Sequence, residues 1–203
     1  VEQFAALGLT VTEQTATLTA WDGRELPMRN IIASTNPEAT DRVLLCAHWD
    51  SRPWADNDPD PANHDKPVPA ANDGASGVAV MLEIARLAAE QPLEDTGLDF
   101  ICFDLEDYGT HNVDDSWCMG SQYWAAHMHK AGYSARYGIL FDMVGGRGAR
   151  FAMEGFSLYY CRPIVQRLWQ FARQLGYTSI FIPNEGGYVT DDHVPVNQIA
   201  GIP

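Results

Sequence analysis

The order of apolar and polar residues along the chain predicts several strands. Residues 14–20 alternate in polarity, Trp21–Arg24 has the composition of a turn, and an extended pattern resumes at Leu26–Ser34. This arrangement predicts an opening β-hairpin. Continuously apolar runs are typical of strands buried on both faces. Such runs occur at Val43–Ala47, Leu98–Phe103, Tyr137–Phe141 and Ser179–Ile182.

Helical patterns separate these strands. Asn72 or Asp73 is a candidate cap for a helix that runs to about Glu90. Two further helices are predicted at Ser121–Lys130 and at Pro163–Leu175, each closed by a following glycine. Buried strands that alternate with helices favour a three-layer α/β/α sandwich. We therefore expect one domain over residues 1–203, with a mainly parallel mixed central sheet and an N-terminal antiparallel hairpin.

Composition narrows the class of protein. The chain has 203 residues, with 13 Lys and Arg against 27 Asp and Glu, which gives a net charge of −14. This charge argues against binding nucleic acid through its phosphates. No stretch approaches the roughly 20 apolar residues that a membrane-spanning helix needs. The four cysteines form no C-x-x-C pair, so a thiolate zinc site is not expected.

Acidic residues and histidines follow the predicted strands. In open α/β sheets, ligands bind beyond the carboxyl ends of the strands, so these side chains should meet at one edge. Oxygen and imidazole ligands suit zinc or harder divalent ions. In the adjacent pair Glu106 and Asp107, one carboxylate can bind metal while the other transfers protons. The residues concerned are His48 and Asp50, Asp104 to Asp107, Asp142, and Asp191 to His193, with Asp73 before the first long helix.

An ordered set of short motifs resembles the animal-type glutaminyl cyclases and their bacterial branch, which are similar to the dinuclear zinc aminopeptidases. Between Glu106 and Gln122 the chain looks more like the bacterial cyclases than the peptidases. The motifs are Leu45–Ser51, Ala71–Gly77, Phe103–Asp107, Gly120–Ser121, Leu140–Val144 and Asp191–Pro195.

The resemblance implies a role for each matching residue. Asp73 and Asp107 would bind one zinc ion per active site, and Glu106 would be the proton shuttle. Asp142 and Asp191 would be the acids that share hydrogen bonds with Glu106. In the aminopeptidases, the positions of His48 and Asp142 hold a second zinc.

The chain departs from the family at two places. Asn112 stands where the family has a tryptophan that lines the substrate pocket, and Trp117 in the same loop is a second candidate for that pocket. The family's third zinc ligand is a histidine that we expect after Pro203, so the sequence is interpreted as truncated at its C-terminus. His193 belongs to the Asp-Asp-His motif and is not that ligand, although it could substitute for it.

The implied activity is cyclisation of the N-terminal glutamine of peptides or proteins to pyroglutamate, with release of ammonia. A dinuclear zinc aminopeptidase is the first alternative, and a non-catalytic peptide-binding domain of the same fold is the second. The resemblance favours export to the bacterial periplasm. The sequence does not define the oligomeric state.

Overall fold

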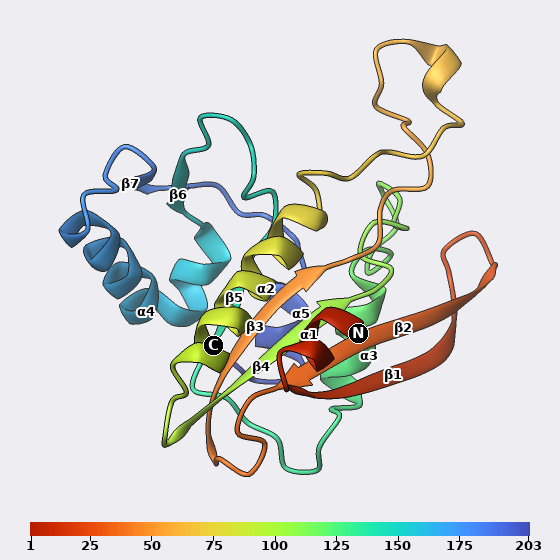
Figure 1. The fold of residues 1–203 in the computed structure, drawn as a ribbon. Coiled ribbons are helices and arrows are strands. Elements are labelled where there is room, and N and C mark those ends of the chain that lie inside the picture. The colour runs from red at the N-terminus through yellow and green to blue at the C-terminus, as the bar shows by residue number, and fades with distance from the viewer.

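The computed structural model describes residues 1–203 and contains five α-helices, one short 3₁₀ helix and seven strands (Figure 1). The helices are α1 (Glu2–Ala6), α2 (Ala75–Glu90), α3 (Met119–Ala126), α4 (Gly155–Gln174) and α5 (His193–Gln198), with the 3₁₀ helix at Pro61–Asn63. The strands are β1 (Thr10–Thr19), β2 (Glu25–Ser34), β3 (Asp41–His48), β4 (Thr96–Phe103), β5 (Gly138–Leu140), β6 (Phe151–Met153) and β7 (Phe181–Glu185). None of the helices has the length and apolar character needed to span a bilayer.

Five strands form a mixed central sheet in the order β1-β2-β4-β3-β5. β1 and β2 make the predicted antiparallel hairpin, and β2 pairs antiparallel with β4. β3 pairs in parallel with both β4 and β5. The register sets His48 opposite Phe103, so β3 and β4 end at the same level. The residues that follow these two strands therefore start side by side.

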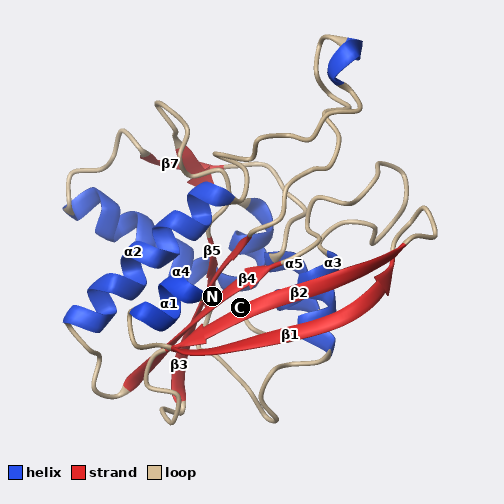
Figure 2. Cartoon of the chain, turned by 45° about the vertical axis from the view of Figure 1, so that its right-hand side comes forward, coloured by secondary structure: helices blue, strands red, loops and turns tan.

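Helices cover both faces of this sheet and give the three predicted layers (Figure 2). On one face, Met81 and Ala85 of α2 and Phe4 of α1 pack on Leu45 and Phe100. On the other face, α3 and α5 contribute Trp124 and Val196 to a second core. The apolar runs at Val43–Ala47 and Leu98–Phe103 supply buried residues to both cores, which confirms the predicted fold class.

Two glycines allow helices to approach the strand ends closely. A Cβ on Gly77 in α2 would overlap the carbonyl oxygen of Phe141, and one on Gly120 in α3 would overlap that of Asp104. Because both contacts are with backbone, neither can be relieved by a side-chain rotation. The two helices are thus fixed at the edge of the sheet where the acidic residues emerge.

The predicted start of α2 and the predicted end of α3 are wrong. The N-cap of α2 is Gly74 at φ +81°, with no side-chain cap. Asn72 and Asp73 do not cap the helix because their side chains bond elsewhere: Asn72 Oδ1 accepts from the Gly145 amide, and Asp73 contacts His48. α3 ends at Ala126 and not at Lys130, since His127 already leaves the helical conformation at φ −133° and ψ 56°.

The C-terminal third also differs from the prediction. The third apolar run forms only a three-residue, half-buried strand, β5. The fourth run does not join the central sheet, because β7 pairs in parallel with β6 in a separate two-stranded sheet beside α4 (Figures 1 and 2). α4 begins at Gly155, eight residues before Pro163, and Glu154 caps it. The helix is interrupted at Cys161, close to the proline that restricts the preceding backbone.

The segment between β3 and α2 leaves the body of the molecule as a long loop (Figure 1). Backbone hydrogen bonds close its base, from Ala55 N to Lys66 O at 2.7 Å and from Val68 N to Arg52 O at 3.0 Å. The 3₁₀ helix lies within the outer part of this loop. The base of the loop is therefore ordered by its own backbone.

A charged pair is buried within the central sheet. Asp99 of β4 is 1% exposed. Its carboxylate accepts hydrogen bonds from Arg42 Nε at 2.5 Å and from Arg42 Nη2 at 2.6 Å. Ser34 Oγ and Tyr133 Oη also donate to this carboxylate, at 2.6 and 2.7 Å. Burial opposes the charge, but these hydrogen bonds lower the pKa of Asp99 below its usual value.

Replacing Asp99 with Asn should destabilise the fold. The substitution leaves the Arg42 charge buried without its partner, so we expect the free energy of unfolding to fall by about 3–5 kcal/mol. Because the folded pKa is depressed, this contribution is present above the unfolded pKa of about 3.9 and is lost as pH falls through the lower folded pKa. Urea unfolding between pH 2 and pH 7 measures it. The exposed variant Glu83→Gln is the control, and an unchanged midpoint for Asp99→Asn would contradict the expectation.

Candidate metal and acid–base site

Five segments bring acidic side chains and one histidine to a single edge of the central sheet. His48 ends β3, Glu106 and Asp107 follow β4, and Asp142 follows β5. Asp73 precedes α2, and Asp191 precedes α5. The predicted convergence is therefore present, although β7 takes no part in it and Asp191 arrives through the loop before α5.

His48 lies at the centre of this group. Its Nε2 atom is 3.0 Å from Asp73 Oδ1 and 3.3 Å from Asp142 Oδ1. Its Nδ1 atom is buried without a hydrogen-bond partner, although Asp50 Oδ1 lies 3.4 Å away. Burial alone would lower the pKa of His48, but the surrounding carboxylates of Asp142, Asp50 and Asp73 raise it far above its usual value. The surrounding carboxylates therefore favour the positively charged form of the His48 ring.

The two adjacent acids after β4 are held by Asp50. Its Oδ1 accepts from the Glu106 amide at 3.1 Å and its Oδ2 from the Asp107 amide at 3.0 Å. Leu105, just before them, adopts φ +54°, which is uncommon for a residue with a side chain. The hydrogen bonds from Asp50 therefore help to hold this segment in its unusual backbone conformation. The sequence identifies Asp50 only as an acid at a strand end, because its hydrogen-bond partners are set by the β3–β4 register.

Glu106 is half-buried in a cluster of acids that oppose its charge, and one thiol donates a hydrogen bond to it. Cys118 Sγ donates to Glu106 Oε1 at 3.5 Å, and Asp191 lies in the same cluster. Burial, followed by the charges of Asp192 and Asp191, raises the pKa of Glu106 to about 10. In the absence of a cation this carboxyl is protonated at neutral pH.

The neighbouring carboxyls are also shifted. Burial and the charge of Asp73 raise the pKa of Asp107 to about 6, and burial and the charge of Asp142 raise that of Asp191 to about 7. Burial also raises the pKa of Asp192 well above its usual value. Neither carboxylate oxygen of Asp192 has a hydrogen-bond partner. Such a concentration of shifted groups is typical of functional sites.

These donor atoms fit a divalent cation. Ligand atoms of His48, Asp73 and Asp142 lie within 4.8 Å of one another, and so do those of His48, Glu106 and Asp107. The expected ligands Asp73 and Asp107 thus belong to two groups that share His48. Carboxylate and imidazole ligands match zinc chemistry, and a dication would offset the repulsion that raises the pKa values.

The remaining candidates lie outside these donor groups. His193 points to Glu154, with Nε2 3.3 Å from Oε2, and burial lowers its pKa. Trp117 is half-buried and packs against Arg52, whose guanidinium carbon is 4.8 Å from the ring centroid. Asn112 is exposed in the loop before Trp117 and has φ +66°.

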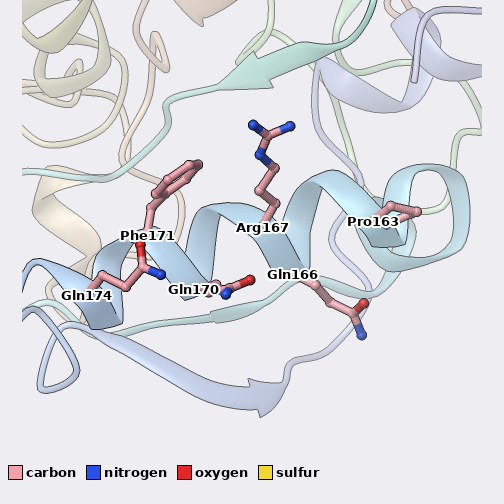
Figure 3. Close-up of a pocket in the computed structure, with 6 residues that line it drawn as sticks. All are labelled: Pro163, Gln166, Arg167, Gln170, Phe171 and Gln174. Carbon is pink, nitrogen blue, oxygen red and sulfur yellow. The ribbon is translucent and has the colours of Figure 1, made fainter.

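A hollow of about 480 Å³ lies elsewhere, on the outer surface of α4 (Figure 3). Its lining is mainly polar and contains none of the clustered acids. It therefore does not mark the candidate site. The residues around it are Pro163, Gln166, Arg167, Gln170, Phe171 and Gln174.

Because the acids are crowded, ionising Glu106 should lower the free energy of unfolding. A carboxyl whose folded pKa is raised destabilises the fold as pH rises from its unfolded pKa of about 4.3 towards the folded value. We therefore expect Glu106→Gln to stabilise the metal-free chain at pH 8 by at least about 1 kcal/mol and to have little effect at pH 4. Urea unfolding at both pH values tests this. Glu38→Gln, at an exposed position, is the control, and a loss of stability at pH 8 would refute the assignment.

Known proteins resemble this chain over most or all of its length. The structure of Porphyromonas gingivalis glutaminyl cyclase matches with a TM-score of 0.98 and 52% identity, covering 100% of this chain and 70% of that chain. A Zn-dependent exopeptidase from Parabacteroides distasonis matches with a TM-score of 0.96 and 49% identity, also covering 100% and 70%.

Curated sequences give more distant matches. Aminopeptidase YwaD of Bacillus subtilis is 29% identical over 188 residues, which cover 86% of this chain and 34% of YwaD. The uncharacterised Escherichia coli protein YfbL is 31% identical over 144 residues, which cover 71% and 39%. The chain thus spans between about a third and two fifths of these relatives. The sequence profile of peptidase family M28 matches residues 30–203, and the chain belongs to this family.

Proposed function

We propose that the protein is a zinc-dependent glutaminyl cyclase, which converts the N-terminal glutamine of peptides or proteins to pyroglutamate and releases ammonia. The observation that carries the proposal is the half-buried Glu106, set in a cluster of acids beside the buried candidate ligand Asp107. The 52% identity to the Porphyromonas gingivalis cyclase over the whole chain supports it. Export to the periplasm is a further part of this proposal.

In this proposal Asp73 and Asp107 hold one zinc ion, which when bound polarises the oxygen of the substrate γ-carboxamide as a Lewis acid. The third ligand is a histidine that the family resemblance places after Pro203, and His193, whose Nε2 lies 3.3 Å from Glu154 Oε2, does not replace it. The raised pKa of Asp107 reflects crowding that a neighbouring dication would relieve.

No protein nucleophile is needed, because the substrate's own α-amine attacks its γ-carbonyl carbon. Holding the two groups close lowers the barrier through entropy. Glu106 takes a proton from the amine as the C–N bond forms and gives it to the amide nitrogen, which leaves as ammonia. Glu106 must be ionised to begin this cycle, so its pKa of about 10 has to fall in the loaded site.

Asp191 and Asp142 support this proton transfer. Burial, followed by the charge of Asp142, raises the pKa of Asp191 to about 7. Asp191 in turn lies in one cluster with Glu106. The pair can therefore adjust the charge beside Glu106 while its proton moves.

A dinuclear aminopeptidase is the second candidate. Its specific support is the group formed by His48, Asp73 and Asp142, which offers three ligand atoms for another ion. The 49% identity to the Parabacteroides distasonis exopeptidase is consistent with it. In that reaction Glu106 would activate a water molecule and not a substrate amine.

Substrate and metal content distinguish the two activities. We expect the protein, expressed from its complete reading frame, to release ammonia from glutaminyl peptides, to leave leucyl anilides intact and to bind one zinc per chain. His48→Ala should keep that zinc, because the proposed ligands are Asp73 and Asp107. Coupled ammonia assays and metal analysis measure these quantities. Anilide cleavage with two zincs, one of them lost in His48→Ala, would establish the aminopeptidase.

The role of Glu106 has its own test. Glu106→Gln should lower kcat by about a hundredfold or more, because the side chain can no longer accept a proton. Its zinc content should equal that of the unmodified protein, and Glu38→Gln should match the unmodified protein in both measurements. Loss of zinc in Glu106→Gln, or unchanged turnover, would assign Glu106 a different role.

A further inference from the structure

Arg52 is a largely covered arginine next to the candidate site, and neither a ligand nor an acid–base role accounts for it. Its side chain is 11% exposed. Its Nη1 atom donates to the carbonyl oxygens of Asp107 at 2.8 Å and of Gly109 at 3.2 Å. Asp50, two residues earlier, binds the amides of Glu106 and Asp107. In the segment after β4, Asp50 therefore binds backbone amides and Arg52 binds backbone carbonyls.

Other contacts fix the orientation of the guanidinium. Asp56 binds it through two atoms, with Nε to Oδ1 at 2.7 Å and Nη2 to Oδ2 at 2.6 Å. Its carbon atom lies 4.8 Å from the ring centroid of Trp117 and 5.2 Å from that of Trp54. A planar guanidinium can satisfy a carboxylate, two carbonyls and two aromatic faces together, whereas a lysine ammonium cannot.

Trp117 connects these contacts to Glu106. A Cβ on Gly109 would overlap the Trp117 ring, so the ring rests directly on this part of the loop. Cys118 follows Trp117, and its amide donates to Glu106 O at 3.1 Å while its thiol contacts Glu106 Oε1. A displacement of Arg52 would therefore reach both carboxylates, Asp107 through its carbonyl and Glu106 through Trp117 and Cys118.

We propose that Arg52 is a positioning residue that sets the orientation of Glu106 and Asp107 by binding the Asp107 and Gly109 carbonyls between Trp54 and Trp117. The inference deepens the proposed function and rests on it for its catalytic consequence. Its structural consequence, restraint of the segment 106–109, does not depend on which reaction takes place.

Arg52→Lys, which keeps the charge, tests the proposal. Loss of a residue that orients a metal ligand typically costs about 10–100-fold in activity, so kcat should fall by that amount while KM stays within about twofold. Arg24→Lys is the matched control. Arg24 and Arg52 both line a surface hollow of about 430 Å³, but Arg24 donates to the Tyr108 hydroxyl and not to these carbonyls. The kinetics of Arg24→Lys should therefore change less than about twofold.

Hydrogen exchange in the metal-free protein is the second measurement. In Arg52→Lys the amides of Glu106 and Asp107 should exchange at least about tenfold faster, with no change in the amides of β3. Asp56→Asn, which keeps Arg52 but removes its carboxylate partner, should give a smaller increase and serves if Arg52→Lys does not fold.

Each outcome decides the role of Arg52. Unchanged exchange of the Glu106 and Asp107 amides, or a change in KM without a change in kcat, overturns the proposal. If the unmodified protein releases no ammonia from glutaminyl peptides, the proposed function fails, and the exchange measurement then decides on Arg52 alone.

Discussion

The parallel pairing of β3 with β4 is the constraint on which the candidate site depends. Because His48 lies opposite Phe103, the chain leaves both strands at the same level. Asp50 is then within reach of the Glu106 and Asp107 amides. A shift of one residue in this register would turn these side chains to opposite faces and separate the ligands. The two cores on either side of the sheet oppose such a shift, since β3 and β4 contribute buried residues to both.

Electrostatic repulsion is the cost of this arrangement. Several carboxyls lie close together around a single imidazole. Their burial and mutual repulsion raise the pKa values of Glu106, Asp107 and Asp191. The Arg42–Asp99 pair, in the same sheet, is the opposite case, because there a buried acid has four hydrogen-bond donors and a depressed pKa. One sheet thus contains a charge pair that stabilises the fold and an acid cluster that strains it. The strained cluster is the one suited to bind a cation and move protons.

The sequence predicted the hairpin, β3, β4 and the position of the acids, because long apolar runs and the polar residues that end them are local signals. It placed β7 in the wrong sheet, since a short apolar run does not identify its partner. It missed the roles of Asp50 and Arg52, whose partners are backbone atoms more than 50 residues away. It also could not reveal that Asp99, a charged residue inside an apolar run, is paired with Arg42 in the interior. These features are set by tertiary contacts and produce no periodic pattern of apolar residues in the sequence.

The closed base of the loop between β3 and α2 has an evolutionary consequence. Asp50, Arg52 and the Arg52 partner Asp56 all lie at the base of the loop, next to the Ala55–Lys66 hydrogen bond, and Asp73 follows the loop. Changes of length in the outer part, around the 3₁₀ helix, are therefore insulated from the ligands. Insertions or deletions in this outer part should therefore be tolerated without displacing the clustered acids.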